Sequence, residues 1–90
     1  DVLDRAMIDL LSFYRDVLVS QMGGDVKRVN IDLAEVLDRV AASTGPEQSL
    51  ARIAAIEQCR ARLRSNASPL LAVESLMVQL RPQARPVSEP

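Results

Sequence analysis

The chain has 90 residues, the size of one small domain. Apolar residues make up 48% of it but aromatic residues only 2%, so we expect an aliphatic core built from helices. The 11 Lys and Arg residues are nearly balanced by 12 Asp and Glu residues, and a net charge of -1 gives no overall field for nucleic acid or anionic lipid. The absence of histidine removes the commonest general base and metal ligand, and the single Cys59 excludes an internal disulfide.

A first helix is predicted from Val2 to Met22, because apolar residues recur every three to five positions and charged residues fall largely on the other face. Gly23 and Gly24 are expected to end it, since glycine readily takes the left-handed conformation of a helix end. The predicted buried stripe consists of Leu3, Met7, Leu10, Tyr14, Val17 and Met22, widened by Ala6, Leu11, Phe13 and Leu18.

A second helix is predicted to begin after Asn30, a good N-cap, and to end near Ser43. Asp32 and Glu35 lie early in it, where negative charge is favoured by the helix dipole. Its buried stripe is expected to be Leu33, Val36, Leu37 and Val40.

Residues 44–47, Thr-Gly-Pro-Glu, have the pattern of a capping box and predict the start of a third helix. This helix should run to about Arg64. Its predicted inner face is Leu50, Ile53, Ile56, Cys59 and Leu63.

A fourth helix is predicted from Pro69 to about Leu80, with Ser68 as its N-cap and the proline at its first position, where a missing N–H is harmless. Its inward residues are expected to be Leu70, Val73, Leu76, Met77 and Leu80. These patterns predict an all-α fold, a small bundle of four to five helices over residues 1–81. Residues 82–90 are proline-rich and are expected to form a flexible tail.

No catalytic, cofactor-binding or metal-binding residues are predicted, and this segment is not expected to be an enzyme. The paired carboxylates lie on helix surfaces, where a solvated face is the simpler interpretation. Cys59 lies on an inward stripe, which favours a small buried residue over a reactive thiol. No apolar run reaches the roughly 18 to 20 residues that a membrane span needs, so no membrane partner is expected and the cytoplasm is the expected location.

Several polar residues are candidates for other roles. Arg60, Arg62 and Arg64 complement the negative pole of the third helix, and a phosphate-binding patch is the alternative. Asn66 lies in a tight turn, where its amide can satisfy orphan backbone groups at the two helix ends. Glu74 lies within an otherwise apolar helix and is expected to be partly buried against an arginine of this chain or of a neighbour.

Four segments of the sequence stand out: FYRDVL (residues 13–18), VNID (29–32), AIEQCRARL (55–63) and PLLAVESL (69–76), the last preceded by Asn66. Together they resemble the C-terminal collar domains of the bacterial DNA polymerase III clamp loader. The resemblance is greater to the delta-prime subunit than to gamma/tau. The resemblance spans about residues 10–81, and residues 82–90 match nothing in that family. The structural or interface candidates are Arg15, Asp16, Asn30, Asn66, Pro69 and Glu74.

The resemblance implies a non-catalytic assembly domain that holds a subunit in the five-membered collar of the loader and so supports sliding-clamp loading in DNA replication. The implied partners are the gamma/tau and delta subunits, and the chain is expected to be one domain of a longer protein, whose AAA+ module and zinc-binding segment are not included here. Direct contact with nucleic acid is not expected. A helical nucleic-acid-binding domain and a gamma/tau collar domain are the alternatives.

Overall fold

The computed structural model describes residues 1–26, 31–65 and 67–81, and these ranges form four helices and no strand. The all-α class predicted from the sequence is therefore confirmed. Asn30, Asn66 and the predicted tail at 82–90 lie outside the described residues. The helices are α1 (Val2–Gln21), α2 (Ile31–Ser43), α3 (Pro46–Arg64) and α4 (Pro69–Leu80).

The ends of α1 and α4 follow from local sequence as predicted. Gly23, just beyond α1, has a φ of 84°, a left-handed conformation that suits glycine, and its N–H donates to the carbonyl of Ser20. At the start of α4 the hydroxyl of Ser68 accepts a hydrogen bond from the N–H of Leu71, and Pro69 is the first helical residue.

The predicted capping box at the start of α3 is wrong by one residue. Pro46 takes the first helical position, which makes Gly45 the N-cap, and the N–H of Gly45 donates to Oε1 of Gln48 at 3.1 Å. The hydroxyl of Thr44 instead donates to the carbonyl of Val40, at the end of α2. The proline therefore sets the helix start more strongly than the Thr and Glu pattern does.

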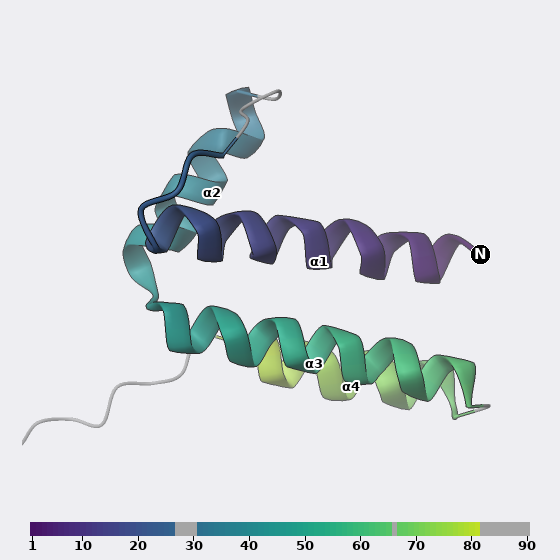
Figure 1. Cartoon of the computed structure of the whole chain (residues 1–90). Coiled ribbons are helices and arrows are strands. Elements are labelled where there is room, and N and C mark those ends of the chain that lie inside the picture. The colour runs from purple at the N-terminus through teal and green to yellow at the C-terminus, as the bar shows by residue number, and fades with distance from the viewer. Residues whose placement is uncertain (27–30, 66, 82–90) are drawn as a thin grey trace, which may run out of the picture.

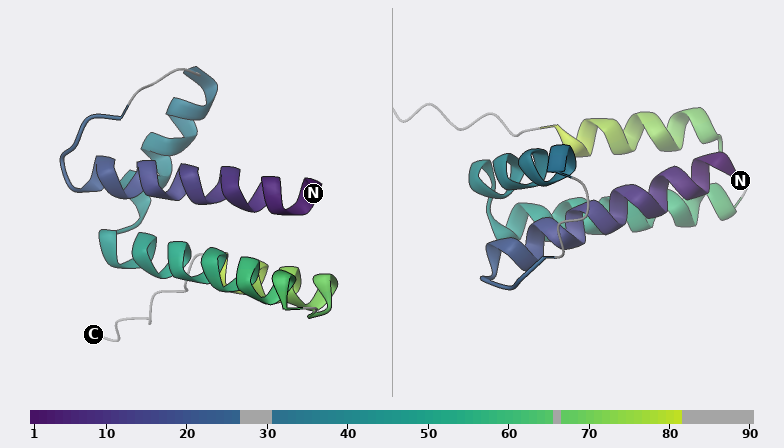
Figure 2. Two further views of the ribbon diagram at one scale, coloured as in Figure 1. Left: turned by 45° about the vertical axis from the view of Figure 1, so that its right-hand side comes forward. Right: turned by 90° about the horizontal axis from the view of Figure 1, so that it is seen from above.

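The helices pack as a connected series in which α3 lies between α1 and α4, and α2 packs against α1 (Figures 1 and 2). No other pair of the described helices has closely approaching backbones, although side chains of α1 and α4 both reach the core beside α3. Figure 2, seen from above, shows α4 running alongside α3, with α2 crossing at the end where α1 finishes. Each of the outer helices α2 and α4 thus has a single neighbour.

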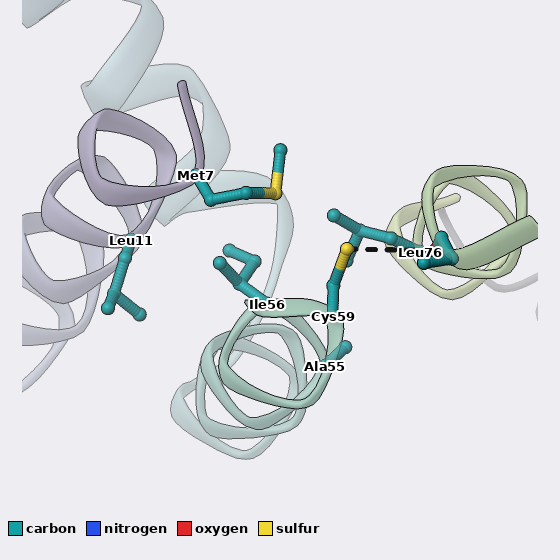
Figure 3. Packing of buried hydrophobic residues seen from close by; sticks show 7 residues of the cluster. Met7, Leu11, Ala55, Ile56, Cys59 and Leu76 are labelled. Atoms are coloured by element: carbon teal, nitrogen blue, oxygen red, sulfur yellow. Dashed lines mark hydrogen bonds between the residues drawn. The ribbon is translucent and has the colours of Figure 1, made fainter. Parts of the chain in front are cut away.

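The core lies where α1 and α4 meet over α3. In Figure 3, Met7 of α1 and Leu76 of α4 point toward each other above α3, with Ile56 and Cys59 rising between them. Partly buried apolar side chains from the same three helices surround this cluster. The buried members are Met7, Leu11, Ala55, Ile56, Cys59, Ala72 and Leu76.

Some residues predicted to face inward are exposed, because the outer helices are covered on one side only. Ser49 and Arg52 are buried on α3 in place of Leu50, since α3 is enclosed from two directions. The predicted inward residues that are exposed are Ala6, Met22, Leu33, Val36, Leu50, Leu70 and Met77.

Candidate docking surface

The outward side of α4 is an apolar surface on which none of the described helices packs. Its side chains Leu70, Leu71, Met77 and Val78 are each 58% to 67% exposed, and we refer to these four residues as the α4 face. The buried residues of the same helix, Ala72 and Leu76, lie on the opposite side at a helical repeat of 3.6 residues. The helix is therefore apolar around most of its circumference.

Glu74 lies in the middle of the α4 face. It was predicted to be partly buried and paired with an arginine. In the chain by itself this prediction is wrong. Glu74 is exposed and forms no ion pair within residues 1–26, 31–65 and 67–81. The α4 face is thus an apolar surface with one negative charge.

A depression continues this surface toward the end of α3. Its volume is about 240 Å³, and it lies between the start of α4 and the last turns of α3. Arg62 borders it and donates through Nη1 to the hydroxyl of Ser75 at 3.3 Å, which holds the guanidinium along α4. The lining residues are Arg62, Ala67, Ser68, Leu71 and Ala72.

The three arginines considered as a phosphate patch do not converge. Arg60 binds the carboxylate of Asp4 at 3.1 Å and so ties α3 to the start of α1, whereas Arg62 bonds across to α4 and Arg64 is exposed. A phosphate group needs several donors at one point, and two of these three are engaged elsewhere. The described arrangement therefore favours structural ion pairs at these positions.

The remaining polar candidates on α1 lie apart from the α4 face. Arg15 pairs with Glu57 of α3 at 3.7 Å, where both side chains are more than half exposed, so that this ion pair adds little stability. Asp16 is half-buried on α1.

Cys59 is a buried core residue, as predicted. Its thiol donates to the carbonyl of Ala72 at 3.6 Å, drawn as the dashed line in Figure 3. Burial raises the pKa of the Cys59 thiol, and the positive charge of Arg62 opposes that shift in part. The thiol therefore stays protonated and poorly nucleophilic at neutral pH.

Two buried polar arrangements were not predicted. Gln21, the last residue of α1, donates through Nε2 to the carbonyls of Ala41 and Thr44 and to the Thr44 hydroxyl, and its Oε1 accepts from Ser49 at 2.7 Å. Arg52 of α3 is buried, with its guanidinium 5.5 Å from the centre of the Tyr14 ring. A glutamine or an arginine in a helical pattern gives no signal of such contacts, because they depend on how the helices cross.

Within the described ranges, no group of three or more His, Cys, Asp and Glu side chains could hold a metal ion, and no helix is both long and apolar enough to cross a membrane.

Comparisons of this chain with protein-family models, with curated proteins and with solved structures find no match. The site is therefore interpreted from its own geometry, and the resemblance to collar domains enters only as a proposal.

Proposed function

We propose that this chain is an assembly domain that docks onto another protein through the α4 face, and more specifically that it is the collar domain of a clamp-loader subunit of the delta-prime type. The observation that carries the proposal is the α4 face itself: four large apolar side chains exposed on one helix. A helix that is apolar all round is normally buried on all sides, and here only one side is covered by the chain.

The energetics favour a covered α4 face. Full burial of a Leu, Met or Val side chain stabilises a complex by roughly 1.5 to 3 kcal/mol, so the four side chains together supply several kcal/mol before the cost of association. Contiguous apolar patches of this kind on small proteins commonly mark interaction sites. The depression beside Leu71 extends the surface and offers a place for a side chain of the partner.

The charge at the centre of the surface argues for a partner other than a second copy of this chain. Glu74 lies near the middle of α4, which spans Pro69–Leu80, so an antiparallel pair of α4 helices would bring two carboxylates together. Like charges in an interface are unfavourable by several kcal/mol. A different protein with an apolar helix and one Arg or Lys opposite Glu74 fits better.

The resemblance gives the proposal its specific form. PLLAVESL, one of the segments that resemble the collar family, contains two of the four α4 face residues, Leu70 and Leu71, and also Glu74. In a collar this helix would contact a neighbouring subunit, and gamma/tau and delta are the proposed partners. The nucleic-acid-binding alternative is less favoured, because the arginines that it would use point to different parts of the surface.

A binding experiment with purified loader subunits tests this proposal. The chain, carrying a fluorophore, is titrated with gamma/tau and with delta. The same titrations are made with Leu71→Asp and with the control Leu33→Asp, at an exposed position of α2, a helix whose backbone does not approach α4. We expect binding by the unaltered chain and by the control, and at least about tenfold weaker binding by Leu71→Asp, since a buried unpaired carboxylate costs more than 1.4 kcal/mol.

Circular dichroism spectra of both variants should match that of the unaltered chain, because both positions are exposed. If no loader subunit binds the unaltered chain, the collar assignment is wrong. If both variants bind equally well, the α4 face is not the docking surface.

A further inference from the structure

Arg52 is the one charged side chain buried within the described part of the chain, with 8% of its surface exposed. Its guanidinium contacts the Tyr14 ring, but no carboxylate and no hydrogen-bond acceptor among residues 1–26, 31–65 and 67–81 receives its N–H groups. Arginine stays protonated in proteins, and a buried charge without an anion is unfavourable. The cation–π contact offsets part of this penalty but supplies no hydrogen-bond acceptor for the guanidinium.

These donors open onto a small cavity between the start of α3 and the end of α4. The cavity has a volume of about 50 Å³, and Gln48, Ala51, Arg52, Gln79 and Arg81 line it. No side-chain N or O atom of the described residues is both fully enclosed and without a partner, so the guanidinium nitrogens of Arg52 are not fully enclosed, and Arg52 is part of the cavity lining. Among the described residues, two cationic and two amide side chains border the cavity, and no carboxylate does.

The backbone at this place also favours negative charge. Gln48 is the third residue of α3, in the first turn, where backbone N–H groups lack helical acceptors and the helix dipole is positive. Oε1 of Gln48 is already used by the N–H of Gly45, which leaves the NH₂ group of its side chain as a donor. The NH₂ group of Gln79 is bonded to the Ser75 hydroxyl, so Oε1 of Gln79 is an acceptor at this place, and the donors here are those of Arg52, Arg81 and Gln48.

We propose that this cavity is a carboxylate-binding site, in which Arg52 donates to the two oxygens and Arg81 supplies a second positive charge at the mouth. Its volume suits a group of a few atoms, since roughly 10 to 15 Å³ already accommodates one water. A planar carboxylate matches the fork of an arginine. The carboxylate comes from an Asp or Glu side chain of another protein or from a small free acid.

Nuclear magnetic resonance of the full chain tests the site, with the Arg52 Nε–Hε signal as the reporter. Sodium acetate is titrated at constant ionic strength against sodium chloride, and sodium phosphate is titrated in parallel. We expect a saturable change with acetate that chloride does not produce. Arg81→Gln should weaken the acetate affinity by about tenfold, as expected for the loss of one charge-assisted contact, whereas the control Arg39→Gln, on an exposed position of α2, should leave it unchanged.

Two blocked peptides distinguish the sources of the carboxylate. Acetyl-Ala-Glu-Ala-amide should bind at least as well as acetate if the site receives a protein side chain, and it should be excluded if only a small free acid fits; acetyl-Ala-Gln-Ala-amide is its neutral control. Either result supports a carboxylate site. Arg52→Lys keeps the charge but not the fork, and it removes the Arg52 signal, so the side-chain NH₂ signal of Gln48 and the backbone amide signal of Ala51 are followed in its place. Their response to acetate, present in the unaltered chain, should be lost in this variant while the chain remains folded.

A response to acetate no larger than that to chloride, together with no response to the glutamate peptide, would overturn the proposal. So would binding of phosphate in preference to both carboxylates. Neither result bears on the binding of loader subunits to the α4 face, which uses other residues.

Discussion

Gln21 is the residue at which three helices are joined. It ends α1, its NH₂ group reaches the carbonyls at the end of α2, and its Oε1 accepts from Ser49 near the start of α3. Ser49 is fully buried and has this oxygen as its acceptor. Both ends of one amide are therefore used in fixing how the chain passes from α1 to α3.

We expect Gln21→Ala to destabilise the fold by roughly 1 to 3 kcal/mol, because it leaves the Ser49 hydroxyl and the Thr44 carbonyl without their partner. Urea unfolding followed by circular dichroism measures the change. Gln58→Ala, at an exposed position of α3, is the matched control and should change the free energy of unfolding by less than about 0.5 kcal/mol. Equal effects of the two substitutions would contradict the role assigned to Gln21.

Single-residue features divide into those that the sequence predicts and those that it does not. Cys59 was predicted to be buried because its position in the apolar repeat is enough to place it. Gln21 and Arg52 escaped prediction because polar residues are expected at the surface, and their burial follows from helix crossings that a one-dimensional pattern does not contain. The carboxylate site depends on Arg52 and could not have been predicted either.

At the scale of the element, α4 shows which features local sequence predicts and which depend on packing. Its start at Ser68 and Pro69 was predicted because capping involves only neighbouring residues. Its buried side was predicted only in part, since five of its apolar positions were assigned inward whereas α3 covers just the arc around Ala72 and Leu76. An apolar pattern predicts a face that avoids water, and it does not say whether the same chain or another one covers it.

The two sides of α4 should therefore respond differently to truncation. Leu76→Ala should destabilise the chain by roughly 2 to 5 kcal/mol, because Leu76 is 2% exposed and belongs to the core cluster. Leu71→Ala, on the α4 face, should cost less than about 0.5 kcal/mol in the isolated chain. Thermal and urea unfolding of the two variants measure the difference. A large loss for Leu71→Ala would mean that this side chain is covered in solution.

At the scale of the whole molecule, the helices form a series and not a closed bundle. Among the described helices, α3 and α1 each have two neighbours, whereas α2 and α4 have one each. A sequence of four amphipathic helices is compatible with either arrangement, because the connections are short in both. The open arrangement explains why apolar residues of α2 and α4 remain exposed, and it leaves the α4 face available for the proposed partner.

This arrangement also implies that stability is uneven along the chain. Helix α2 packs on α1 alone, and Leu37 is the one buried residue among its described side chains, whereas α3 holds Ile56 and Cys59 between two neighbours. Regions with few buried contacts open locally at lower free energy than the rest.

We expect the amide hydrogens of α2 to exchange at least about tenfold faster, relative to their unfolded rates, than those in the middle of α3. This ratio corresponds to a difference of about 1.4 kcal/mol in the free energy of local opening. Hydrogen exchange followed by nuclear magnetic resonance measures both sets in one sample. Equal protection of α2 and α3 would show that the four helices unfold as one unit, and the single contact of α2 would then be as strong as the core.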